Sequence, residues 1–135
     1  MSQNKLTPRD LAQYRSFITR KLLPLIARRR EQLIQENFVD LSFKLSHKET
    51  ELNSIVSRLA ITEIQEIVTD LSNVGTRLEQ VTNKVEAAIA ELKDINKVIG
   101  VLTSFVNIFR TILGGQPIAA IAQFINDIDR LSARA

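Results

Sequence analysis

The dominant pattern in this sequence is a regular row of apolar residues in its second half. From Leu71 onward they recur in alternating steps of three and four, which is the spacing of one helix face and of a coiled-coil seam. With Ile64 and Ile67, which precede it in the same phase, the row spans about seven heptads, well beyond a chance match. The predicted seam, which Ala88 completes, consists of Leu71, Val74, Leu78, Val81, Val85, Leu92, Ile95, Ile99, Leu102, Val106, Phe109 and Leu113.

This seam predicts one long helix over residues 47–113. Ser46 and Glu49 form a capping box at its start. A second capping-box match directly after Ile61 leaves two alternatives, a break near that residue or a continuous helix. The part from 62 to 113 alone would be about 78 Å long, which exceeds the size of a compact domain of this length. Other helices of the chain, or a second chain, must therefore cover part of the seam.

The N-terminal pattern predicts a kinked helical segment over residues 7–37, after a flexible N-terminus over residues 1–6. Thr7 is suited to cap the first helix. Pro24 lacks a backbone donor, so we expect the helix to kink or restart near Leu22.

Residues 38–46 are predicted to form a connector. From Val39 to Leu45 apolar and polar residues alternate, which is the period of a β-strand. A lone strand has no partner within this chain. The alternatives are an extended connector and a strand that pairs with a second copy.

The C-terminal part predicts an apolar helical hairpin. Gly114 ends the long helix, and Pro117 begins a last helix over residues 117–132. Each arm is shorter than the roughly 20 apolar residues that cross a bilayer. The hairpin is therefore interpreted as bundle core or oligomer interface, with shallow membrane insertion as the alternative. Its apolar residues include Phe105, Ile108, Ile112, Ile121, Phe124 and Ile125.

Together these elements predict an all-α fold, a single helical domain over residues 7–135. We expect a helical bundle with one long coiled-coil-like helix and shorter flanking helices, completed by oligomerisation. A hydrophobic content of 44% and a charged content of 24% exclude a disordered chain. With four glycines and three prolines, a loop-rich or all-β fold is disfavoured.

Positive charge is concentrated near the N-terminus. Residues 1–36 hold eight Lys or Arg and three Asp or Glu, a net charge of +5, whereas residues 37–135 hold ten and twelve, a net charge of −2. The basic residues either pair with acids elsewhere in the chain or contact an anionic membrane surface. Nucleic acid is a weaker candidate, because few aromatic residues and no known reader motif accompany them. The predicted anionic-surface contacts are Arg20, Lys21, Arg28, Arg29 and Arg30.

No motif for catalysis, a metal or a cofactor is present in the sequence. His47 is the one histidine, there is no cysteine, and no phosphate-binding loop or nucleophile elbow occurs. We therefore expect no catalytic residue, metal site or cofactor, and we interpret His47 as a solvated helix residue. The absence of cysteine and of an apolar leader favours a cytoplasmic location, with peripheral membrane contact as the alternative.

The functional hypothesis is a non-enzymatic helical assembly, scaffold or adaptor protein. It would act through self-association along the seam, as a homo-oligomer, and by binding helices of a partner protein. The alternative is a membrane- or hydrophobic-surface-associated protein, which would use the basic N-terminal helix and the apolar C-terminal hairpin.

Overall fold

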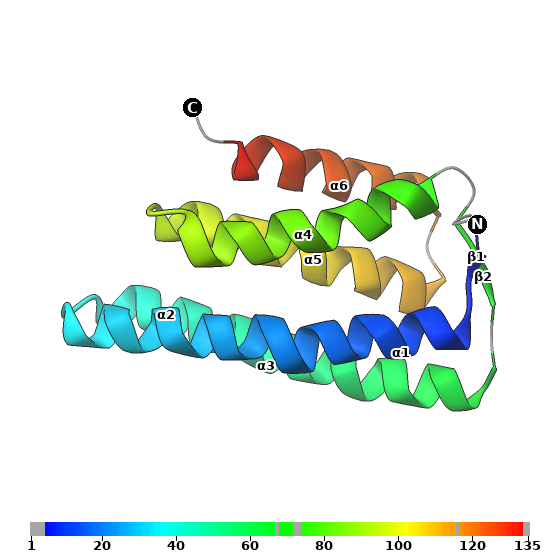
Figure 1. Ribbon diagram of the computed structural model, residues 1–135, viewed down its shortest axis with the longest axis horizontal. Coiled ribbons are helices and arrows are strands. Elements are labelled where there is room, and N and C mark those ends of the chain that lie inside the picture. The colour runs from blue at the N-terminus through cyan, green and yellow to red at the C-terminus, as the bar shows by residue number, and fades with distance from the viewer. Residues whose placement is uncertain (1–4, 67, 72–73, 116, 134–135) are drawn as a thin grey trace.

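The chain folds as an all-α helical bundle, as its sequence predicts (Figure 1). The computed structural model describes residues 5–66, 68–71, 74–115 and 117–133. The helices are α1 (Pro8–Phe17), the π-helix η1 (Ile18–Leu22), α2 (Leu23–Gln35), α3 (Val39–Ile64), α4 (Gly75–Glu91), α5 (Ile95–Gly114) and α6 (Ala119–Ser132). Two short strands, β1 (Lys5–Leu6) and β2 (Thr69–Asp70), pair antiparallel at one end of the bundle.

Two layers of helices make up the bundle. The rod α1–η1–α2 runs antiparallel to α3, and this pair forms one layer in Figure 1. Helices α4 and α5 lie above it, with α2 against α4 and α3 against α5. Helix α6 returns along α4 and α5 and covers both. The turn between α2 and α3 extends beyond the other helices at the left end of the view.

The N-terminal rod begins where its sequence predicts, but near Leu22 it changes helix type and continues as one rod in place of the predicted kink (Figure 1). Thr7 caps α1 in a full capping box with Asp10, and the Asp10 amide donates to the Thr7 hydroxyl at 3.2 Å. The π-helical turn η1 ends two residues before Pro24, which lies in the first turn of α2. Proline cannot donate a backbone hydrogen bond, so the bonding pattern changes there while the axis continues.

The prediction of a flexible N-terminus is wrong for Lys5 and Leu6, the two residues of this segment that the structure describes. Lys5 and Leu6 form β1, with Lys5 opposite Asp70 and Leu6 opposite Thr69. The Leu6 side chain is buried. Residues 1–4 lie outside the described residues.

The predicted connector at residues 38–46 is also wrong, because this segment is the start of α3. Its strand-like alternation arises from two different helix faces. Ser42 and Leu45 are buried against the bundle, whereas Val39 and Phe43, four residues apart, point to solvent. The capping box at Ser46 is not used, since the helix has already run for two turns there.

The helix predicted over 47–113, either continuous or broken near Ile61, is replaced by parts of three helices, and the first break falls at Gln65. The chain leaves α3 at Gln65, and Glu66 has a φ of 56°. It breaks again after α4, where Leu92 is extended and Asp94 caps α5 by accepting from the Asn96 amide at 3.0 Å. Ile67 and residues 72–73 of the predicted span lie outside the described residues. The seam keeps its phase across the second break, so periodicity alone does not reveal that the helix has ended.

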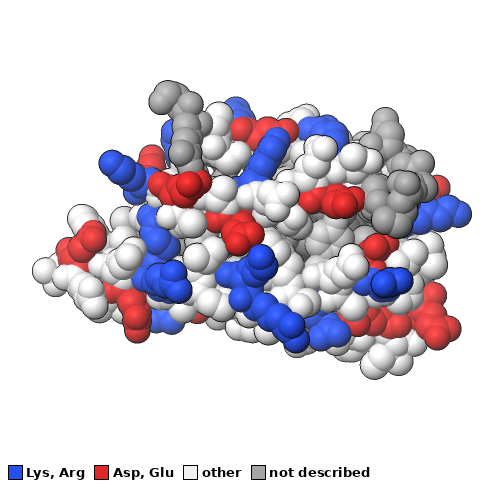
Figure 2. Space-filling view, viewed as in Figure 1, with Lys and Arg blue, Asp and Glu red and all other residues white. Residues whose placement is uncertain are grey.

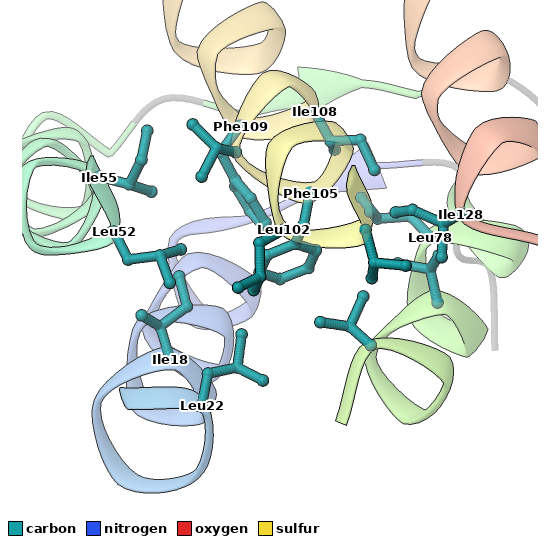
Figure 3. Close-up of a cluster of buried hydrophobic side chains, with 14 of the residues drawn as sticks. Ile18, Leu22, Leu52, Ile55, Leu78, Leu102, Phe105, Ile108, Phe109 and Ile128 are labelled. Carbon is teal, nitrogen blue, oxygen red and sulfur yellow. The ribbon is translucent and has the colours of Figure 1, made fainter. Parts of the chain in front are cut away.

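Helix α5 is the centre of the hydrophobic core. It contacts α3, α4 and α6, and its aromatic residues also reach α1. Phe105 is fully buried between the two layers (Figure 3). Its ring centroid lies 5.1 Å from that of Phe109 and 6.2 Å from that of Phe17, both in edge-to-face geometry.

Within the described residues, α5 is the one helix long and apolar enough to suit a membrane span. In this structure 56% of its most apolar stretch is buried inside the bundle. The helix ends at Gly115, whose φ of 68° is in the left-handed region that glycine adopts without strain. This confirms the predicted glycine stop before α6. Gln116 lies outside the described residues.

Replacing Phe105 with alanine is expected to lower the free energy of unfolding by about 3–5 kcal/mol, because it removes a buried ring and leaves a cavity. Phe43→Ala is the matched control. That ring is 70% exposed, so we expect a change within about 0.5 kcal/mol. Urea denaturation of both variants measures the difference, and similar losses would contradict the placement of Phe105 at the centre of the core.

Candidate functional site

The predicted oligomer seam lies inside the chain's own core. Nine of its twelve residues are buried, and the other three, Leu92, Ile99 and Leu113, are partly buried against the same cluster. The break between α4 and α5 allows the two halves of the seam to be covered by α2, α3 and α6. A second copy is thus not required to remove the seam from water.

The predicted apolar C-terminal hairpin is present as α5 and α6. All of its named residues are buried except Phe124, which is partly buried. Ile121, Ile125 and Ile128 of α6 point toward α4 and α5, and the polar residues Gln123 and Asn126 are exposed. The described residues of this hairpin therefore present no continuous apolar face to solvent.

The predicted basic contacts are divided between two roles. Arg29 donates to the backbone oxygens of Ile89 at 2.5 Å and Leu92 at 2.8 Å, which are carbonyls at the C-terminal end of α4. Arg30 pairs with Glu49 of α3. Both are structural contacts, in line with the alternative that the arginines pair within the chain.

The remaining basic residues of that group, Arg20, Lys21 and Arg28, are exposed. None of them has an ion pair within the described part of the chain. They lie on the solvent side of η1 and α2. In Figure 2 basic side chains are visible along the face that this rod presents.

A cluster of four exposed apolar side chains lies at the turn between α2 and α3, which we call the hairpin tip. It consists of Ile34, Phe38, Val39 and Phe43, whose exposed fractions are 49%, 51%, 51% and 70%. This surface was not predicted from the sequence, because residues 38–46 were expected to form a connector. The sequence signal for it is that residues 34–43 include more apolar residues than one buried helix face can accommodate.

The hairpin tip is held by a defined turn. Asn37 has a φ of 66°, the Phe38 amide donates to the Leu33 oxygen at 2.8 Å, and the Asn37 amide donates to the Ile34 oxygen at 3.1 Å. This pair of bonds is the Schellman arrangement that ends many helices. Leu33 and Leu45 are buried below the turn. The exposed side chains therefore project from a backbone that is fixed by hydrogen bonds and packing.

Acidic side chains surround the hairpin tip. Glu31, Glu36 and Asp40 are exposed and have no ion pair within the described residues, and Lys44 is the one base between residues 31 and 44. The segment thus carries three negative charges and one positive charge, a net charge of −2. Figure 2 shows this end of the molecule as white surface with acidic side chains beside it.

A second apolar patch lies at the opposite end of α3, and we call it the far-end patch. Its described members are Ile61, Ile64 and Val68, which are 56%, 82% and 53% exposed. Ile67 lies outside the described residues. The adjacent Glu63 is paired with Arg15 of α1 at 2.6 Å. Like the hairpin tip, this patch includes a residue beyond a helix end, Val68, and a residue with a positive φ, Glu66, lies next to it in the chain.

A cleft of about 390 Å³ separates α2 from the end of α4. Residues spaced three and four apart on α2 form one wall, and residues 90–93 form the other. The lining residues are Leu25, Arg28, Arg29, Gln32, Ala90, Glu91, Leu92 and Lys93. The hydrogen bonds of Arg29 to α4 connect the two walls.

A cluster around Glu51 connects α3 to α5. Lys48 donates to Glu51 at 2.8 Å, and Arg110 donates to its other oxygen at 2.8 Å. Partial burial opposes ionisation, but the hydrogen bond and charge of Lys48 and the charge of Arg110 together hold the pKa of Glu51 below its ordinary value. The cluster accounts for Arg110, the one charged residue of α5 after Lys97.

The described residues hold no candidate metal-binding cluster. Across residues 5–66, 68–71, 74–115 and 117–133, no group of three or more His, Cys, Asp or Glu could hold a metal ion. His47 is exposed on α3, as its sequence context predicts, and its Nε2 lies 3.9 Å from a Glu51 oxygen. Burial raises the pKa of Tyr14 above its ordinary value, with added effect from Glu79 and Asp10.

Comparison with known proteins gives no relative: no family model, no curated protein and no solved structure matches this chain. The surfaces described above are therefore the basis for any functional proposal.

Replacing Arg29 with methionine is expected to lower the free energy of unfolding by about 1–3 kcal/mol, because two carbonyls at the end of α4 lose a charged donor. Arg28→Met removes the same charge from the neighbouring exposed position and should have little effect. Thermal denaturation of the two variants distinguishes them, and equal destabilisation would show that Arg29 does not hold α2 against α4.

Stability should also fall in acid because of Glu51 and Glu63. The hydrogen bond from Arg15 lowers the pKa of Glu63, as Lys48 and Arg110 lower that of Glu51. A lowered native pKa stabilises the fold above the ordinary value of 4.5, and this stabilisation is lost as the pH falls through the native pKa.

Glu51→Gln should therefore lower stability at neutral pH and flatten the acid side of the curve of unfolding free energy against pH. Glu36→Gln, at an exposed acid outside these contacts, is the control. Urea midpoints measured between about pH 3 and pH 7 test this expectation. A Glu51→Gln curve parallel to that of the unmodified chain would rule out a contribution from this cluster.

Proposed function

We propose that this chain is a non-enzymatic helical adaptor whose hairpin tip binds a basic amphipathic helix of a partner protein. The observation that supports this proposal is the cluster of four exposed apolar side chains on a fixed turn at the end of a bundle. Exposed apolar clusters of this kind mark interaction sites more often than isolated surface residues do.

The fold does not depend on the exposed part of the tip. Leu33, Ser42 and Leu45 pack against the bundle from the same two helices, so this stretch already has buried anchors. Phe38 and Phe43 project away from that contact. Their aromatic rings lose little conformational entropy on binding and are common at the energetic centre of interfaces.

The size of the tip favours a short binding element over a stable dimer. Burying the exposed half of four such side chains contributes on the order of 3–6 kcal/mol, less than many estimates of the cost of association. A standard protein interface buries roughly 1,600 Å², which is more than one helical turn can provide. A single helix that lies across the tip and adds charge contacts fits this size.

The charge around the tip favours a basic partner. Glu31, Glu36 and Asp40 surround the apolar residues with no ion pair in the described part of the chain. Two tips placed against each other by a two-fold axis would bring two net charges of −2 together. An anionic membrane surface would be repelled in the same way. A helix with a Lys or Arg face beside an apolar face complements both features.

We do not assign self-association to the heptad seam, because its residues are buried or partly buried within one chain. We therefore place the assembly function at the hairpin tip, where the chain would bind a helix of a partner protein. For the membrane alternative, the apolar residues of the α5–α6 hairpin, which are buried or partly buried here, would have to leave the bundle.

A direct test uses the double variant Phe38→Ser with Phe43→Ser. The probe is a labelled amphipathic peptide of about 18 Leu and Lys residues, long enough for five helical turns. At about 0.15 M salt, the double variant is expected to bind at least about tenfold more weakly than the unmodified chain. Fluorescence anisotropy gives the two dissociation constants.

The matched control is Ile61→Ser with Ile64→Ser, which removes two exposed apolar side chains from the far-end patch. It should leave the affinity unchanged. Equal loss in both double variants, or no loss in either, would overturn the proposal. Light scattering and flotation with anionic vesicles provide two further arms. Self-association or vesicle binding that depends on Phe38 and Phe43, without peptide binding, would assign the tip to a second copy or to a membrane.

A further inference from the structure

The cleft between α2 and the α4–α5 turn (Leu92–Asp94) has the features of an anion-binding site. Arg28 and Lys93 lie on its opposite walls, and both side chains are exposed. Neither has an ion pair in the described part of the chain. We propose that this cleft binds a phosphomonoester, with Arg28 and Lys93 as the residues that contact the phosphate.

Arg29 gives the cleft its rigidity. Its guanidinium bridges the walls through hydrogen bonds to the Ile89 and Leu92 oxygens, so the distance between α2 and the α4–α5 turn is fixed. Leu25, Arg28 and Gln32 are spaced three and four apart and share one face of α2 with it. A cationic pair held on two fixed elements loses less conformational freedom on binding than two residues on one mobile loop.

The charge of the cleft matches a dianion. Its lining holds three cations, Arg28, Arg29 and Lys93, and one carboxylate, Glu91, a net charge of +2. Glu91 already has an interaction partner within the chain. A phosphomonoester carries a charge of about −1.5 to −2 at neutral pH and several acceptor oxygens, whereas a carboxylate carries one charge. A phosphate therefore matches the guanidinium of an arginine and the ammonium of a lysine better than a carboxylate does.

The remaining lining indicates what the phosphate is attached to. Leu25, Ala90 and Leu92 supply apolar surface next to the cations. The volume of about 390 Å³ is at the lower end of the range for small-molecule sites. The ligand class is a phosphate group on a compact apolar or aromatic body. Such a group is found on a soluble metabolite or on the headgroup of a phosphomonoester lipid.

This site is independent of the hairpin tip. It uses residues 25–32 of α2 and the end of α4, whereas the tip uses residues 34–43. The site is also distinct from the rest of the basic surface. Arg20 and Lys21 are exposed cations of the same rod, but they do not line the cleft. Those two residues supply the control for the experiment.

The experiment compares two double variants with equal loss of charge. Arg28→Gln with Lys93→Gln removes both proposed phosphate contacts, and Arg20→Gln with Lys21→Gln removes two cations outside the cleft. All four side chains are exposed, so both variants should fold, which circular dichroism checks. Phenyl phosphate is the soluble probe, titrated by calorimetry or by NMR shifts up to about 10 mM. Vesicles of phosphatidylcholine with and without phosphatidic acid are the lipid probe.

We expect the unmodified chain to bind one probe, the cleft variant to bind it at least about tenfold more weakly, and the control variant to remain within about twofold. Binding of phenyl phosphate assigns the site to a soluble phosphomonoester. Binding to phosphatidic acid vesicles alone assigns it to a lipid headgroup. No binding of either probe, or equal weakening in the two double variants, would overturn the proposal. Neither result depends on Phe38 or Phe43, so failure here is distinguishable from failure of the adaptor function.

Discussion

The burial of α5 is the constraint on which the rest of this structure depends. This helix carries apolar residues around most of its circumference, so a single neighbour cannot cover it. Helices α3, α4 and α6 surround it, and the rings of Tyr14 and Phe17 reach it from α1. The short link at Leu92–Asp94 lets α4 turn back and serve as one of these neighbours. The bundle can therefore bury its most hydrophobic element without a second chain or a membrane.

With α5 buried, the sides of the molecule differ in what they expose to solvent. The α4–α6 side is closed by ion pairs such as those of Arg77 and Lys84 with Asp129. The two ends of α3 retain exposed apolar side chains, and the cleft beside Arg29 retains cations without ion pairs in the described residues. Both proposed binding surfaces adjoin α2. Its arginines illustrate how consecutive residues on a helix serve different purposes, because each is rotated by about 100° from the last. Arg29 caps α4, Arg30 pairs with Glu49, and Arg28 faces the cleft.

Much of the local structure was predictable from short-range chemistry. The capping box of Thr7, the change of helix at Pro24 and the stop at Gly115 each depend on one or two neighbouring residues. The candidate surfaces were less predictable. The hairpin tip requires Asn37 in a left-handed conformation, and the sequence pattern around it resembles a strand. The cleft combines residues of α2 with residues about sixty positions later, so no local pattern could indicate it.

The sequence by itself determined that the chain is helical, where several helices are capped, and that it contains a long apolar stripe to be removed from water. Only the tertiary structure decided what removes it. A heptad stripe has the same periodicity in one long helix that joins a second chain and in two shorter helices that are covered within one chain. The choice depends on whether the remaining helices can reach and cover the stripe. Here the breaks at Gln65 and Leu92 allow them to do so, and the residues left exposed are those that this packing does not need.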